Sequence, residues 1–207
     1  MVQGVCTTDG DDVARVRDSG QGQDAVRAVG LVPLLGRGDL PLALLHGKSL
    51  ALLATSALTH AGVASLQPDV MWTAVRDSGL TVVLHDPLCP LTPAAFISDA
   101  IDAAAYGAVA VGVRPVTDTI KTVAGALVGE TVDRDSLWTV TSPVVLPSAV
   151  VSALTNEPDL TDFAALVTSL RERWEVVFVE APSLGRRLGD ETDVLLLEAF
   201  AGSASPP

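Results

Sequence analysis

Short apolar runs that alternate with helix-like segments constrain the fold of this chain more than any other feature. The clearest run is residues 81–84 (TVVL), and similar runs occur at residues 29–34, 108–113 and 176–179. Short apolar runs of this kind are typical of buried strands. The segments between them predict helices at residues 50–60, 93–105, 161–173 and 190–200. The alternation predicts an α/β fold, in which a mostly parallel sheet forms the middle of a three-layer, Rossmann-like arrangement.

Local signals predict where some of these helices begin and end. Gly62 follows the segment 50–60 and is expected to stop that helix. Thr92 is expected to cap the helix that starts at Pro93, because proline is favoured at the first helical position. The helix of residues 161–173 is expected to start near Thr161 or Asp162.

Length and composition predict one large domain. The chain has 207 residues, of which 48% are hydrophobic and only 4% aromatic, so its core must consist mainly of Ala, Val and Leu. We expect this domain to span residues 29–200. Residues 1–28 are polar and are expected to be poorly ordered or variable, and residues 201–207 form a tail.

Charge and hydropathy argue against several classes of partner. The net charge is −12, and the two lysines and eleven arginines form no basic run that could bind nucleic acid. The longest apolar stretch, residues 40–58, is interrupted by HGKS and does not resemble a membrane span. Residues 7–28 do not resemble a secretory signal, and Cys6 and Cys89 form no disulfide framework. A cytoplasmic protein is the expectation.

Two loops that follow predicted strands could carry chemistry. Asp86 follows the strand of residues 81–84, at the edge of a parallel sheet where ligands usually bind. A carboxylate there could hold Mg²⁺ beside bound phosphates, or it could simply cap the turn before Pro87. Gly36, Arg37 and Gly38 could present backbone N–H groups and one cation to phosphates, or they could form an ordinary turn.

Residues 116–121 (VTDTIK) and 131–138 (TVDRDSLW) are more specific, because this pair resembles the 2-C-methyl-D-erythritol 4-phosphate cytidylyltransferase family. That family typically carries VxDTxK and TVDRxxLW segments in this order. Residues 83–91 (VLHDPLCPL) are similar to its VHDAARPL segment, and residues 32–38 (VPLLGRG) are similar to its glycine-rich loop. The resemblance extends over roughly residues 29–200.

The resemblance implies a nucleotide-diphospho-sugar-transferase-like fold and transfer of a cytidylyl group from CTP to a sugar-alcohol phosphate, with release of pyrophosphate. It implies a homodimer joined by a protruding β-arm, residues 116–142. Asp86 would hold Mg²⁺, and Gly36, Arg37 and Gly38 would bind the nucleotide. The other implied roles are catalysis by Asp86, Arg37, Lys121 and Arg187 and substrate binding by Asp118, Thr119, Arg134 and Ser142.

Departures from the family pattern leave two hypotheses open. Leu42 stands where the family has a lysine on the reacting phosphate, Cys89 replaces an arginine, and Arg187 replaces a second lysine. The segment that helps the family to recognise cytosine has no counterpart between Gly62 and residue 83. Either Arg37 or Arg187 supplies the missing charge in an active, divergent nucleotidyltransferase for CTP or another nucleotide, or the chain is a non-catalytic relative that binds a phosphate ligand or a protein partner.

Overall fold

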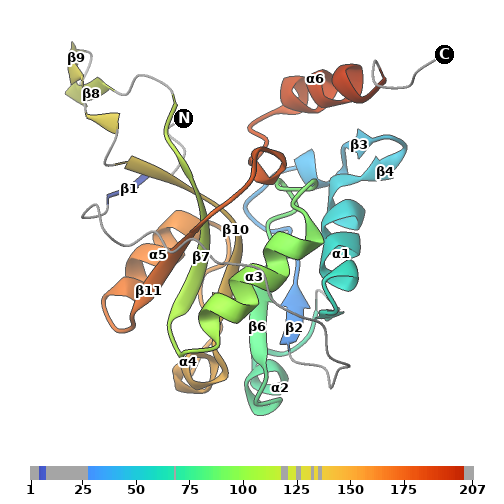
Figure 1. Cartoon of the computed structure of the whole chain (residues 1–207), viewed down its shortest axis with the longest axis vertical. Helices are drawn as coiled ribbons and strands as arrows, with labels where there is room; N and C mark the ends of the chain where they lie inside the picture. The colour runs from blue at the N-terminus through green and yellow to red at the C-terminus, as the bar shows by residue number, and fades with distance from the viewer. Residues whose placement is uncertain are drawn as a thin grey trace.

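A computed structural model describes residues 5–7, 28–67, 69–117, 121–124, 127–131, 133–134 and 137–202. Its centre is a seven-stranded sheet in which six strands follow the order β11-β7-β10-β6-β2-β5. Only β10 runs antiparallel to its neighbours along this path, and the β11–β7, β6–β2 and β2–β5 pairs are parallel (Figure 1). The strands of this sheet are β1 (Val5–Thr7), β2 (Ala28–Leu31), β5 (Ala64–Ser65), β6 (Thr81–Leu84), β7 (Val109–Pro115), β10 (Leu137–Leu146) and β11 (Val176–Glu180).

Helices cover both faces of the sheet, which gives three layers. On one face, α1 and α3 pack on residues such as Val83 and Val145. On the other face, α2, α4 and α5 pack on residues such as Val82 and Val144. The helices are α1 (Leu50–His60), α2 (Trp72–Asp77), α3 (Ala94–Ala104), α4 (Ser148–Ala153), α5 (Phe163–Arg171) and α6 (Glu191–Gly202), with 3₁₀ turns at Leu40–Leu42 and Ser183–Gly185.

Two short hairpins lie outside the main sheet. β3 (Leu44–Leu45) pairs with β4 (Lys48–Ser49) beside α6, and the contact includes a hydrogen bond from His46 N to Glu198 Oε1 of 2.9 Å. β8 (Lys121–Ala124) pairs with β9 (Leu127–Thr131) at the end of an arm that projects from β7 and β10, away from the helices (Figure 1). No helix in the described ranges is both long enough and apolar enough to cross a membrane.

The predicted elements match the structure closely in the core and less well at their ends. The helix of residues 50–60 and the strand of residues 81–84 have the predicted bounds. The prediction that Thr92 caps the next helix is wrong, because Pro93 occupies the N-cap position and the Thr92 hydroxyl donates to Cys89 O at 2.9 Å. Asp162 caps α5 through bonds from Ala164 N and Ala165 N.

The long strand β10 is the main element that the sequence patterns did not indicate. It begins at Leu137, so residues 137–142, which were expected in the arm, pair with β7 or lie between its paired segments in the main sheet. Leu137 and Val140 are each 5% exposed, as core residues are. On the side of β10 that faces β6, β1 pairs with residues 137–139.

Candidate functional site

The site begins where two neighbouring parallel strands end at the same edge of the sheet. Leu31 at the end of β2 pairs with Leu84 at the end of β6, so the loops that follow these strands start side by side. Arg37 lies in the first loop and Asp86 in the second, and Arg37 Nε donates to Asp86 Oδ1 at 2.8 Å. The strand order therefore brings together the two loops that the sequence singled out.

The Asp86 carboxylate binds two arginines. Arg187, in the segment between the Ser183–Gly185 turn and α6, donates from Nε to Asp86 Oδ2 at 2.9 Å. Leu88 N donates to Oδ1 at 3.0 Å. Burial by itself would raise the pKa of Asp86, but the charges of Arg37 and Arg187 and these hydrogen bonds outweigh burial and lower that pKa below its usual value. The carboxylate is therefore ionised, and each of its oxygens accepts at least one hydrogen bond.

The two arginines differ in what else they can bind. The Arg37 side chain is 1% exposed, and its Nη1 donates to Leu35 O at 2.7 Å and to Leu160 O at 2.9 Å. Its guanidinium also lies 5.0 Å from the centre of the Phe163 ring. The Arg187 side chain is 27% exposed, and within the described residues its Nη1 and Nη2 donate to nothing. Arg187 is the arginine of this pair that can reach a ligand.

The loop of residues 36–38 depends on glycine. Gly36 has φ +82°, and a Cβ at this position would lie 2.7 Å from Thr161 Cβ. Gly38 has φ +57° with open space around it. Among the described residues, the N–H groups of Gly36, Arg37 and Gly38 donate no hydrogen bond within the protein. These backbone donors are free to bind solvent or an anion.

Ser142 lies behind the carboxylate rather than beside it. The Ser142 side chain is fully buried, and its Oγ accepts from Asp86 N at 2.9 Å and contacts His85 Nδ1. Burial lowers the pKa of His85 to about 4, against a smaller opposing effect of the Asp86 charge. His85 is therefore neutral at pH 7, and in the described structure its Nε2 has no partner. Ser142 positions the backbone of Asp86.

The position of Ser142 is itself set by a close approach between β7 and β10. A Cβ on Gly112 would lie 2.8 Å from Ser142 O, so only glycine fits at this position of β7. The pairing of β10 with β7 shifts register between Val140 and Val144, around Ser142. The irregularity turns the serine toward the end of β6.

Asp86, the expected Mg²⁺ ligand, is already bound by two arginines. Both oxygens accept from guanidinium groups, and the side chain is 3% exposed. No group of three or more His, Cys, Asp or Glu side chains that could hold a metal ion occurs in the described part of the chain. Asp86 is the shared counter-ion of Arg37 and Arg187.

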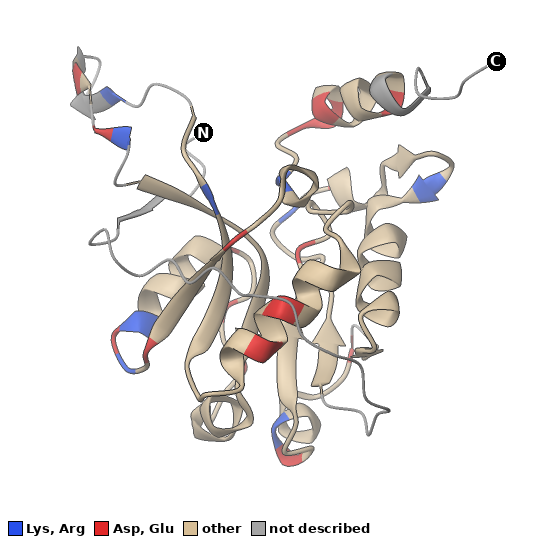
Figure 2. Ribbon diagram, viewed as in Figure 1, with Lys and Arg blue, Asp and Glu red and all other residues tan. Residues whose placement is uncertain are grey.

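The arm residues are not brought to this cluster within one chain. Lys121 is exposed at the start of β8, where it pairs with Thr131 at the open end of the β8–β9 hairpin. Arg134 is exposed and donates from Nη1 to Thr117 O at 2.6 Å. Asp118 and Thr119 lie outside the described residues. Basic residues are spread over separate elements, including the arm and the segment before α6 (Figure 2).

Two positions that differ from the family pattern also differ in environment. Leu42 is 65% exposed in the 3₁₀ turn that follows the glycine loop. Cys89 is fully buried, and burial, followed by the Asp86 charge, raises the pKa of its thiol well above the usual value. Leu42 could therefore accept a longer side chain, whereas Cys89 belongs to the packed interior.

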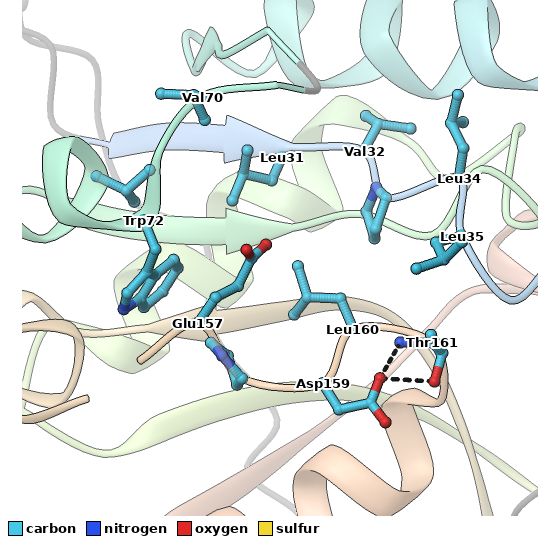
Figure 3. A pocket seen from close by; sticks show the side chains of 13 residues that line it. Leu31, Val32, Leu34, Leu35, Val70, Trp72, Glu157, Asp159, Leu160 and Thr161 are labelled. Carbon is cyan, nitrogen blue, oxygen red and sulfur yellow. Dashed lines mark hydrogen bonds between the residues drawn. The ribbon is translucent and has the colours of Figure 1, made fainter. Parts of the chain in front are cut away.

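A cavity of about 450 Å³ adjoins the cluster, and its walls come from three segments (Figure 3). One wall is residues 31–35 after β2, another is Val70, Trp72 and Val75 around α2, and the third is residues 157–161 before α5. Sequence reasoning missed the last two walls. Trp72 was a possible signal in a chain with 4% aromatic residues, but a single glutamate such as Glu157 in a loop gives none.

The sequence of this chain is similar to that of a known enzyme family. A sequence profile described as "IspD: 2-C-methyl-D-erythritol 4-phosphate cytidylyltransferase" matches residues 51–201. A relative from Bacillus velezensis bearing that enzyme name is 31% identical over 134 residues, which cover 62% of this chain but 57% of the relative. A relative from Corynebacterium diphtheriae with the same name is 29% identical over 202 residues and covers 91% of this chain and 74% of the relative.

Solved structures agree with the fold. The crystal structure of 2-C-methyl-D-erythritol 4-phosphate cytidylyltransferase from Thermus thermophilus matches with a TM-score of 0.63 and 22% identity, over 84% of this chain and 98% of that one. The predicted α/β, Rossmann-like fold and the predicted family are both confirmed. With a profile that matches most of its length, this chain belongs to the 2-C-methyl-D-erythritol 4-phosphate cytidylyltransferase family.

Proposed function

We propose that the chain is a divergent nucleotidyltransferase that moves a nucleoside monophosphate group from a nucleoside triphosphate to the phosphate of a small sugar alcohol. Family membership supports this class of reaction, for which CTP and methylerythritol phosphate are the first substrates to test. The observation that carries the proposal is the Arg187–Asp86–Arg37 cluster. It holds a partly exposed cation at the carboxyl edge of the sheet.

In the proposed reaction, a phosphate oxygen of the acceptor bonds to the α-phosphorus of the triphosphate. The bond from that phosphorus to the bridging oxygen breaks, and pyrophosphate leaves with the electron pair. Charge builds up on the phosphate oxygens, so fixed cations and N–H donors lower the barrier. Arg187 would supply a planar pair of donors, and Asp86 would hold it in place. The free N–H groups of Gly36, Arg37 and Gly38 would bind phosphate oxygens.

Arg37 has a supporting role in this proposal. Its guanidinium is buried against Asp86, Leu35 O and Leu160 O, so turning toward a ligand would leave the two carbonyl oxygens unpaired and remove its bond to Asp86. It would fix the glycine loop instead. Of the two arginines considered as replacements for the missing lysine, Arg187 is favoured by its 27% exposure.

In the proposed enzyme, the arm joins two copies of the chain into a homodimer. The β8–β9 hairpin projects from the main sheet, and Lys121 and Arg134 are exposed on the arm (Figure 1). A second copy would place its Arg134 against the acceptor phosphate, and the same arm segment carries Lys121, Asp118 and Thr119 in its sequence. Both oxygens of Asp86 already accept from arginines, so Mg²⁺ would be bound chiefly by the triphosphate. Any Mg²⁺ requirement would arise from the triphosphate.

The test is pyrophosphate release with each of the four nucleoside triphosphates and methylerythritol phosphate, with and without Mg²⁺. Arg187→Gln should lower kcat by about 10²- to 10³-fold. Arg186→Gln is the matched control, because Arg186 lies next in sequence, is 49% exposed and pairs with Asp193 instead. Absence of turnover with all four nucleotides, in folded and dimeric protein, would refute the proposal.

A non-catalytic relative is the second candidate, and Leu42 favours it. This side chain is 65% exposed where the family pattern has a lysine, so no cation reaches the triphosphate from that turn. Leu42→Lys separates the two candidates, since the exposed position accepts a lysine without repacking. A several-fold rise in pyrophosphate release supports the enzyme. If the variant binds nucleotide but stays inert, the chain is a phosphate-binding or partner-binding relative.

A further inference from the structure

His85 is a fully buried residue that connects three strands at the site. It follows β6, and its backbone N donates to Leu31 O, at the end of β2, at 2.9 Å. Its side chain contacts β10 instead, through Nδ1 and Ser142 Oγ. The same serine oxygen accepts from Asp86 N at 2.9 Å. His85 therefore lies directly behind the carboxylate that binds both arginines of the cluster.

The single hydroxyl hydrogen of Ser142 determines where the proton of His85 lies. Ser142 Oγ accepts from Asp86 N, and among the described residues its other hydrogen-bond contact is His85 Nδ1. If the serine donates to Nδ1, the histidine proton lies on Nε2, and only this Nε2–H group is unpaired. If Nδ1 carries the proton, both the buried serine O–H and the bare Nε2 are unpaired. Because each unpaired buried group costs free energy, the first arrangement is favoured.

With its proton on Nε2, the His85 ring accepts the Ser142 hydroxyl and leaves a lone pair of the serine oxygen facing Asp86 N. We propose that His85, as the Nε2–H tautomer, is a positioning residue that orients Ser142 and thereby the carboxylate that holds Arg187. The relay of hydrogen bonds stands on geometry alone. Its effect on rate rests on the proposed nucleotidyl transfer.

Nitrogen NMR of the parent protein at pH 8, where ordinary histidines are neutral, tests the tautomer without turnover. In His85, Nδ1 should have the chemical shift of an unprotonated nitrogen and Nε2 that of a protonated one. His60 is the internal comparison, because its Nδ1 lies 2.7 Å from Ser56 O, a carbonyl oxygen that can only accept. Its shifts should tend toward the opposite pattern. A protonated Nδ1 in His85, or shifts averaged between the two tautomers, would overturn the relay.

Two amide variants test which ring nitrogen matters. The oxygen of His85→Asn can take the place of Nδ1 and accept from Ser142, whereas the amide of His85→Gln lies one bond farther out, near the place of Nε2. The Asp86 amide hydrogen should exchange with solvent about fivefold or more faster in His85→Gln, as expected for the loss of one hydrogen bond. In His85→Asn its exchange should stay within about twofold of the parent rate. Exchange of the Val83 amide, inside β6, corrects for any general loss of stability.

The effect on rate separates this inference from the proposed reaction. His85→Gln should lower kcat for pyrophosphate release about tenfold or more and change KM by less than about threefold, because a misplaced cation matters most where charge develops. His85→Asn should recover most of the lost kcat. Equal losses in the two variants, in kcat or in Asp86 exchange, would overturn the positioning role. An Nε2–H tautomer in a parent protein that releases no pyrophosphate from any nucleotide would refute the proposed reaction alone.

Discussion

Arg187 donates to Asp86 across 101 residues of sequence, and Arg37 donates to the other oxygen of the same carboxylate. One carboxylate therefore joins the end of β6 to the loop after β2 and to the segment before α6. Because the Arg37 side chain is 1% exposed, water could not solvate its charge if Asp86 were lost. The cluster is thus a structural joint as well as the candidate site.

Asp86→Asn should destabilise the fold by about 3–5 kcal/mol, because it leaves a buried guanidinium without its counter-ion. Urea denaturation measures the change in the free energy of unfolding. Asp77→Asn is the control, because Asp77 pairs with Arg76 at 3.3 Å on the surface with a side chain that is 69% exposed. That variant should lose less than about 1 kcal/mol. Equal losses in both variants would contradict the structural role of Asp86.

Stability should fall as the pH drops from about 6.5 to about 4, because of His85. Its pKa is about 4 in the folded protein, compared with 6.5 for an ordinary histidine, so the unfolded chain binds more protons in this interval. The stabilisation is complete above pH 6.5 and decreases by up to roughly 3 kcal/mol as the pH approaches 4. Asp86 contributes a further loss only at lower pH, because its pKa is lowered from 3.8.

Urea denaturation at several pH values, in parent and His85→Gln protein, measures this dependence. The variant should lose the slope between pH 6.5 and 4, whatever its overall stability. His60→Gln, at the exposed end of α1, should retain that slope. A parent protein whose stability is flat across this interval would contradict a neutral, buried His85.

Gly36→Ala should be more damaging than Gly38→Ala. Both residues have positive φ, so each substitution brings backbone strain of roughly 1–2 kcal/mol. Only at Gly36 does the new Cβ also meet Thr161, at 2.7 Å. The excess loss for Gly36→Ala in thermal unfolding measures this second effect. Equal losses at the two positions would mean that the loop moves away from Thr161 without resistance.

Cys89 should resist thiol reagents in the folded protein. It is fully buried and its pKa is raised, so little thiolate exists at pH 8 and no reagent reaches it. In a Cys6→Ser background, a chromogenic disulfide should react with Cys89 only after urea is added. Rapid reaction in the absence of urea would show that the loop after β6 opens readily.

Local sequence patterns predicted the helices and strands that are marked by their own residues, such as an apolar run or a glycine stop. The segment 50–60 ends at a glycine, and residues 81–84 are an uninterrupted apolar strand, so both were assigned with their observed bounds. β10 was missed because Thr141, Ser142 and Pro143 interrupt its apolar pattern, although its neighbours β6 and β7 bury it on both sides. Residues 141–143 are therefore extended because β10 pairs within the sheet, and not because of their own strand propensity.

The sequence indicated Asp86 and Arg37 as candidate site residues, but it did not indicate how they contact one another. Asp86 and Arg37 follow strands, and their loop positions made them candidates. Their contact spans 49 residues, and no local pattern shows that the carboxylate would be shared with Arg187. The sequence placed Asp86 at the site but did not indicate the two guanidinium groups that bind its oxygens. The cavity beside the cluster depends on three segments that are far apart in the sequence.

The close approach of Gly112 to Ser142 O limits how this chain can evolve. Any larger residue at position 112 would push the β10 carbonyl outward and shift the serine that anchors Asp86 N. Substitutions deep in a neighbouring strand would then disturb both arginines without touching either. Selection on ligand chemistry therefore extends to a position that no ligand reaches, and glycine there should persist wherever the paired arginines do.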